Sequence, residues 1–177
     1  MRKNLLIWQV GGLTFTAVLG TILHFLFQWV GIDFFASFSA VNESTWEHMK
    51  LVFFPSFIFA IIQSLFVKGE FKCFWLIKLI GIFFGTLLIP ILFYTLKGSF
   101  GEPSAIVNIL IFFLSVGAEY FVELFLFNSV NSKLSFVNGI SFVILLVVLL
   151  LFIVFSFQPP KVPLFLDPVT NKYGIVK

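Results

Sequence analysis

The stretch that decides the fold is ISFVILLVVLLLFIVFSF, residues 140–157, which carries no charge and only two serines. A helix needs about 20 predominantly apolar residues to cross the hydrocarbon core of a bilayer. Four further segments meet this requirement, so that the predicted spans are residues 5–29, 46–67, 74–96, 104–128 and 135–157. The sequence therefore predicts an all-α, polytopic membrane protein with five transmembrane helices in one bundle.

The composition supports this class and excludes others. Of the 177 residues, 60% are hydrophobic and 11% are charged, with a mean hydropathy of +1.11, whereas soluble domains carry about 25% charged residues. The net charge of +3 is spread over loops and the tail, which is typical of contact with membrane lipids and not of nucleic-acid binding. Cys73 is the single cysteine, which excludes an intramolecular disulfide and a cysteine-based zinc site.

The positive residues predict the orientation of the bundle, because cytoplasmic loops carry an excess of lysine and arginine. With the N-terminus on the cytoplasmic side of the cell membrane, the opposite loops hold two lysines, Lys50 and Lys97, and the tail adds Lys161, Lys172 and Lys177. The cytoplasmic side then holds six positive residues, namely Arg2, Lys3, Lys68, Lys72, Lys78 and Lys133. The proline-rich tail, residues 158–177, is expected to run extended outside and to dock on the bundle.

A polar stretch between the first two spans reads VNESTWEHMK, residues 41–50, and is called the polar island below. Ionisable groups next to hydrocarbon each cost several kcal/mol in lost hydration, so they are rarely kept there without a role. Within the island, Ser44 followed by Glu47 has the form of a capping box, which predicts that the second span begins at Ser44.

Depth along the helices predicts which polar groups can meet. With a rise of about 1.5 Å per residue, His24 lies roughly 10 Å outward of the middle of its span, at a depth similar to that of the island. We therefore expect a polar pocket near the outer face, which the tail covers. Its candidate catalytic residues are His24, Glu43, Glu47 and His48, and its candidate ligand-binding residues are Asn42, Trp46, Lys50 and Asp167.

His24, Glu43 and His48 also form a candidate metal site, because imidazole nitrogens and carboxylate oxygens are suitable ligands for a divalent ion. The spacing matches no specific signature such as HExxH. Without a metal, a carboxylate and a histidine can act as general acid and base. A purely structural alternative makes Glu47 a helix cap, Glu43 a partner of the helix dipole and His48 a hydrogen-bonding residue at the interface.

Two acids of the fourth span, Glu119 and Glu123, form a separate group on one helix face. They lie roughly 5–10 Å inward of the middle of the span, so that roughly 16 Å separates Glu119 from Glu47. Intramembrane acids are typical of proton relays, which makes both acids candidate ligand-binding residues of a transporter. Such a transporter would require a homo-oligomer, because five helices are few for a single-chain carrier. The structural alternative is that the acids join helices through hydrogen bonds to Asn108, Tyr94 or Tyr120.

Two motifs resemble those of a family of small bacterial integral membrane proteins of unknown function. They are VNESTWEHMKLVFFP, residues 41–55, and PLFLDP, residues 163–168, followed by Tyr173, Gly174 and Ile175. His24 also lies where that family tends to carry a histidine. The resemblance covers nearly the whole chain and implies a polytopic membrane architecture, but it implies no catalytic roles.

Three hypotheses for the function follow from these residues. The first is a membrane-embedded enzyme or binding protein for an amphiphilic ligand, which uses carboxylate–histidine chemistry with or without a divalent metal. The second is a small proton-coupled transporter or channel subunit that uses Glu119 and Glu123. The third is an accessory subunit of a membrane complex, with the polar island as the partner interface.

Overall fold

The computed structural model describes residues 4–71, 73–130 and 135–175. Short elements are the helix α2 (Asp33–Ala36) and the 3-10 turns η1 (Lys68–Glu70) and η2 (Pro163–Phe165). The described residues form no strand, apart from an isolated bridge between Leu166 and Tyr173. The predicted all-α class is therefore confirmed. Its long helices are α1 (Leu5–Val30), α3 (Thr45–Val67), α4 (Phe74–Phe100), α5 (Ala105–Ser129) and α6 (Ser135–Phe157).

All five long helices are long and apolar enough to cross a membrane. Many of their residues are phenylalanine, isoleucine or valine, which in water favour strands. In hydrocarbon, however, the backbone must satisfy its own hydrogen bonds within one segment, and this favours helices. The helices also contain Pro55 in α3 and Pro90 in α4, which a packed bundle tolerates.

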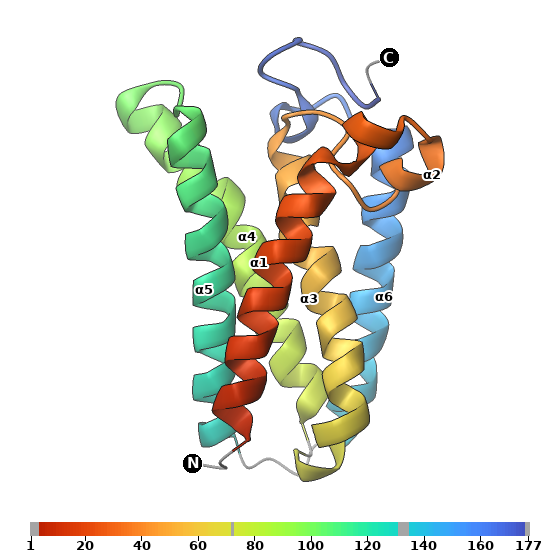
Figure 1. Cartoon of the computed structure of the whole chain (residues 1–177), viewed down its shortest axis with the longest axis vertical. Coiled ribbons are helices and arrows are strands. Elements are labelled where there is room, and N and C mark those ends of the chain that lie inside the picture. Colours follow the sequence, from red (N-terminus) through yellow and green to blue (C-terminus); the bar gives the residue numbers. More distant parts are fainter. Residues whose placement is uncertain (1–3, 72, 131–134, 176–177) are drawn as a thin grey trace.

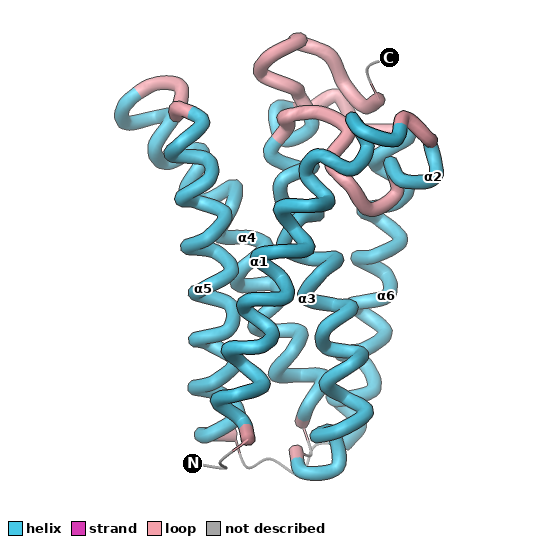
Figure 2. Tube along the Cα trace, viewed as in Figure 1, coloured by secondary structure: helices cyan, strands magenta, loops and turns pink. Residues whose placement is uncertain are grey.

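The long helices run alternately up and down, so the N-terminus and the C-terminus lie at opposite ends of the molecule (Figure 1). We call the end that carries the N-terminus the lower end, and the end that carries α2 and the tail the upper end. Most of the loop structure covers the upper end (Figure 2). The polar island, which leads into α3, therefore lies at the upper end.

Helix α3 is the centre of the bundle. In its most apolar stretch 67% of the residues are buried, whereas the corresponding share in α6 is 22%. It packs against α1 and α4 and also touches α5 and α6. Helix α6 is the most apolar helix and leaves most of its surface uncovered, as expected for a helix that faces lipid. The polar residues Glu47, Lys50, Ser56 and Gln63 of α3 are consequently buried inside the bundle.

Glycines bring α4 and α5 into close contact. A Cβ atom at Gly81 would meet Glu123, and one at Gly85 would lie 2.8 Å from the Cβ of Glu119. The GxxxG spacing of these glycines permits close helix approach. In this chain it makes room for two carboxylic side chains of α5, which also lie four residues apart.

Three local features differ from the sequence-based expectations or add to them. Helix α4 continues to Phe100, past the predicted end at residue 96. Residues 32–41, which are too short to span, contain α2. The tail is not fully extended, because it contains the turn η2. At the upper end the α4–α5 hairpin diverges from α1, α3 and α6 (Figure 1).

Candidate functional site

The upper end brings together three polar residues from two separate segments. His24 lies on α1, Glu43 lies in the loop before α3, and His48 lies in the first turn of α3. Helix α1 ends at Gly31, whose left-handed backbone (φ 67°) turns the chain back toward the bundle. The loop is then held against α1, because the amide of Ala40 donates a hydrogen bond to the carbonyl of Leu23 (3.2 Å). This backbone contact places the island beside His24.

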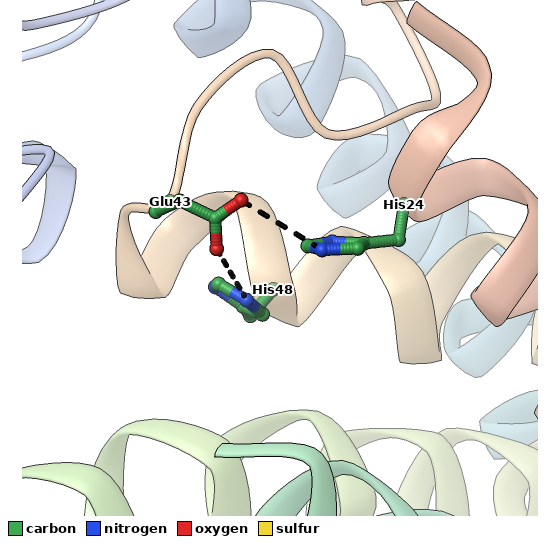
Figure 3. Close-up of side chains that lie close together, drawn as sticks. All are labelled: His24, Glu43 and His48. Atoms are coloured by element: carbon green, nitrogen blue, oxygen red, sulfur yellow. Dashed lines mark ion pairs between the residues drawn. The ribbon is translucent and has the colours of Figure 1, made fainter. Parts of the chain in front are cut away.

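The three side chains converge on one point (Figure 3). The Nε2 atom of His24 lies 3.7 Å from Oε1 of Glu43, and Nε2 of His48 lies 3.5 Å from Oε2 of the same carboxylate. One ligand atom from each residue lies within 4.8 Å of the others. The two imidazole rings are 5.5 Å apart between centroids. We call this arrangement the His–Glu cluster.

A backbone hydrogen bond determines which nitrogen of His48 faces the cluster. Its Nδ1 atom lies 2.9 Å from the carbonyl oxygen of Ser44. Because a carbonyl only accepts, Nδ1 carries the proton and donates it, which leaves Nε2 with a lone pair. Metal-binding histidines are oriented in this way, with the second nitrogen bound to a carbonyl or carboxylate. Helix geometry alone produces this arrangement, since His48 follows Ser44 by one turn.

The cluster is partly open to its surroundings. The side chains of His24, Glu43 and His48 are 24%, 38% and 17% exposed. Glu43 and His48 line a cavity of about 20 Å³, which is enough for a single water molecule. The other walls come from α3, α4 and α5, where the α4–α5 hairpin diverges. They consist of Thr45, Ile89, Phe93, Asn108, Ile111 and Phe112.

Glu47 and Lys50 do not join the His–Glu cluster. The two side chains form a buried ion pair (Oε2 to Nζ, 2.5 Å), and Glu47 also accepts a hydrogen bond from the amide of Val41 (3.1 Å). Lys50 donates to the carbonyl of Ala36 and to the hydroxyl of Ser156, at 3.0 and 2.7 Å. Its side chain is fully buried and its ammonium is paired within the protein, and the suggested ligand contact of Lys50 stays a prediction. This pair ties α2 and α6 to the start of α3.

The predicted capping box is half formed. The hydroxyl of Ser44 accepts a hydrogen bond from the amide of Glu47 (3.4 Å). The amide of Ser44 donates to Asn42 (2.8 Å) and not to the Glu47 carboxylate. Burial explains the difference, because the buried ammonium of Lys50 requires a charged partner and takes the Glu47 carboxylate.

The tail docks on the island through Asn42 and Trp46. The amide group of Asn42 donates to the carbonyl of Gly174 (2.8 Å). Trp46 packs on Phe152 and Phe165, with ring centroids 4.5 and 4.6 Å away. Asn42 and Trp46 therefore hold the tail in place, and their suggested contact with a ligand stays a prediction.

Asp167 shapes the tail itself. Its carboxylate accepts hydrogen bonds from the amide of Val169 (3.0 Å) and from the hydroxyl of Thr170 (2.6 Å). Its backbone amide and carbonyl bond to Lys172 and Asn171. The side chain is thus used within the turn that it closes, and it does not reach the His–Glu cluster. The suggested contribution of Asp167 to a ligand site stays a prediction.

Replacing Asn42 by alanine is expected to lower the free energy of unfolding by about 1–2 kcal/mol, because a buried hydrogen bond to the tail is lost and the amide of Ser44 is left unpaired. The tail should then be cleaved faster in limited proteolysis, which measures its local opening. Asn128→Ala is the matched control, since the exposed Asn128 bonds only to its own helix. Equal cleavage rates for both variants would contradict the docking role of Asn42.

Glu119 and Glu123 lie in the interior, away from the His–Glu cluster. Glu119 accepts a hydrogen bond from Ser56 (2.9 Å), and Glu123 forms an ion pair with Lys78 (2.5 Å). Of the suggested partners, Tyr120 bonds to Thr16 instead (2.8 Å). The sequence does not predict the pairing of Lys78 with an acid, because Lys78 is assigned there to the positive charges of the cytoplasmic side. A lone lysine inside an apolar span is itself an indication of a buried acid opposite.

Comparison with known proteins yields a family without an assigned activity. The family described as "Family of unknown function (DUF6512)" matches residues 1–175 of the chain. No curated protein and no solved structure matches the chain. A function must therefore be argued from the geometry of the site.

Proposed function

We propose that this chain, which belongs to the family of unknown function DUF6512, is a membrane-embedded metalloprotein. In this proposal His24, Glu43 and His48 bind one divalent metal ion at the upper end of the bundle. The observation that carries the proposal is the approach of one ligand atom from each residue to within 4.8 Å of the others. The metal would act on the polar group of an amphiphilic ligand.

The protonation pattern of the cluster supports a bound cation. When the His48 ring is neutral with its proton on Nδ1, the Nε2 lone pair faces an oxygen of Glu43 at 3.5 Å, and two acceptors at this distance repel each other. The distance from His24 to Glu43, 3.7 Å, is too long for a hydrogen bond. A cation between the three groups turns these contacts into favourable ones. Ligand distances of about 2.0–2.2 Å to such an ion are compatible with this spacing after small side-chain rotations.

The ligand set supports a reactive site more than a closed structural one. Two histidines and one carboxylate leave one position open in a tetrahedral zinc site, and this position holds water or substrate in catalytic centres. The adjacent cavity accommodates one water molecule. A metal lowers the pKa of bound water and so generates a nucleophile near neutral pH. Hydrolysis is therefore the reaction class that this arrangement supports best.

The walls of the cavity indicate the kind of ligand. Ile89, Phe93, Ile111 and Phe112 are apolar, and Asn108 is the polar residue that α5 adds. An apolar chain can lie against these walls from the lipid side while its polar group reaches Glu43 and His48. This division suits an amphiphile, because apolar burial and one oriented polar contact together determine binding.

We also propose that the N-terminus is cytoplasmic, which places the His–Glu cluster near the outer face of the cell membrane. Lys50 and Lys78 are buried in ion pairs and so are removed from the count of loop charges. In the sequence, Arg2, Lys3, Lys68, Lys72 and Lys133 then remain on the N-terminal side of the membrane, against Lys97 near the end of α4 and Lys161, Lys172 and Lys177 in the tail. The positive-inside rule supports a cytoplasmic lower end.

Metal binding tests the proposal directly. Protein in lipid nanodiscs is stripped with a chelator, titrated with Zn²⁺ or Co²⁺, and analysed for metal content. We expect one ion per chain, with an affinity that falls below about pH 6 because protons compete for imidazole. His48→Gln and Glu43→Gln should each weaken binding by about 100-fold or more, since changes even outside the ligand set cost 10–100-fold.

The control is Glu102→Gln, which removes an exposed carboxylate paired with Lys97 and should leave binding unchanged. Substoichiometric metal in the wild-type protein would contradict the proposal. So would an affinity that is equal in His48→Gln and in Glu102→Gln, because the bound ion would then lie elsewhere.

A further inference from the structure

A second polar system lies inside the bundle, where α1, α3, α4 and α5 meet. Glu123 is paired with Lys78, and Glu119 accepts a hydrogen bond from Ser56. Both acids are 0% exposed and Lys78 is 1% exposed. Gly81 and Gly85 hold this group together, because a larger residue at either position would collide with the carboxylic side chains. We call Lys78, Glu119 and Glu123 the buried triad.

The charges of the buried triad do not balance unless it holds a proton. Lys78 supplies one positive charge for two carboxyl groups, and no second cation faces them among the described residues. An unpaired carboxylate in an apolar interior is far more costly than its neutral form. The other groups that face the acids are uncharged donors or acceptors: Gln9 and Thr16 on α1, Ser56 on α3 and Tyr120 on α5.

Hydrogen bonding around Glu119 is compatible with such a proton. Its Oε1 atom is buried and has no partner, and the hydroxyls of Ser115 and Thr86 are likewise buried without partners. Ser115 lies one turn before Glu119 on α5, and Thr86 follows Gly85, which Glu119 touches. A proton on Glu119 supplies a donor for acceptor oxygens in this region, and buried polar atoms of this kind require a partner.

Apolar layers close the buried triad from both ends. Above it, Ile89, Ile111 and Phe112 are buried and form the inner wall of the cavity beside His48. Phe112 precedes Ser115 by one helical turn, so this layer separates the cavity from the interior polar groups. Gly20 of α1 makes the layer tight, because a Cβ atom there would lie 2.7 Å from the Phe112 ring.

Beside and below Lys78 the closure is aromatic. The ammonium of Lys78 lies 5.8, 5.4 and 5.9 Å from the ring centroids of Phe59, Tyr120 and Phe127. Phe71 packs on Phe127 at 4.6 Å and also lines a larger pocket at the lower end, about 230 Å³ in volume. The triad thus lies between two pockets and opens into neither.

We propose that the buried triad is an occluded proton-binding site that holds one proton on Glu119 when the bundle is closed. The proton leaves when water enters through the Ile89–Ile111–Phe112 layer. The O–H bond of Glu119 then breaks, its electron pair stays on the carboxylate, and the proton passes to water as hydronium. Rebinding reverses the step. The released state carries one net negative charge, so it is favoured only while water solvates the interior.

Infrared spectroscopy of the protein in nanodiscs tests this proposal without knowledge of a substrate. A protonated carboxyl group absorbs at a higher C=O frequency than a carboxylate and shifts in D₂O. The wild-type protein should show this band at neutral pH. Glu47 should not contribute, because Lys50 neutralises it. Glu119→Gln should abolish the band, and the exposed-site control Glu102→Gln should retain it.

Charge counting gives two sharper expectations. Glu123→Gln should also abolish the band, because Lys78 then neutralises Glu119. Lys78→Met should about double it, because both acids must then be neutral.

Phe112→Ala should speed the shift in D₂O by thinning the upper layer. Absence of the band in the wild-type protein would overturn the proposal, as would its persistence in Glu119→Gln. An immediate shift in D₂O in the wild-type protein would overturn the occlusion.

Discussion

Replacing Lys78 by methionine is expected to lower the free energy of unfolding by about 3–5 kcal/mol. The substitution keeps the length and apolar stem of the side chain but leaves Glu123 buried without its ion-pair partner. It also removes the cation that lies within 6 Å of three aromatic rings. Denaturant-induced unfolding in mild detergent, followed by tryptophan fluorescence, measures the change.

Two controls distinguish the buried pair from ion pairs in general. The double variant Lys78→Met with Glu123→Met should unfold within about 1 kcal/mol of the wild-type protein or be more stable, because a buried pair can be replaced by apolar groups. Lys97→Met removes a pair that is 40% and 64% exposed and should cost less than about 1 kcal/mol. A loss at Lys78 no larger than the loss at Lys97 would contradict a buried pair.

Replacing Gly81 by alanine is expected to lower the free energy of unfolding by about 1–3 kcal/mol. Alanine is otherwise the better helix former by roughly 1 kcal/mol, so the sign of the effect is informative. The added methyl group would overlap Glu123, which cannot move freely because Lys78 and α4 hold it. The same unfolding assay measures this change.

Gly117→Ala is the matched control for that substitution. Gly117 lies inside α5, and a Cβ atom there would meet nothing within 4 Å. The variant should therefore be as stable as the wild-type protein or slightly more stable. Equal free energies of unfolding for Gly81→Ala and Gly117→Ala would contradict the close approach of α4 and α5 at Gly81.

The architecture could be predicted because it depends on properties of short segments. A run such as residues 140–157 has no alternative in a bilayer, since only a helix pairs its backbone groups within one segment. Helix ends were less predictable. Helix α4 continues four residues past its predicted end, through Lys97, Gly98 and Ser99, where hydropathy no longer marks a limit.

Within the candidate site, the depth of each polar residue along its helix could be predicted, but the direction in which its side chain points could not. Helical rise placed His24 and the polar island in one layer, and the structure brings His24 to 3.7 Å from Glu43. The same argument grouped Glu47 and Lys50 with them, although both point into the bundle core. Residues 47 and 48 point about 100° apart on a helix, and only the neighbours of α3 determine which of them faces the cavity.

The amino-acid sequence by itself determined that the chain forms five apolar helices, and it determined the level at which each polar group lies along them. Both follow from hydropathy and from a constant rise per residue. The tertiary structure decided the partners: Glu47 with Lys50, Glu123 with Lys78, and Glu43 with two histidines. The physical reason is that each partner depends on the rotation and spacing of several packed helices. These are determined by contacts between segments far apart in the chain, such as Gly81 and Glu123.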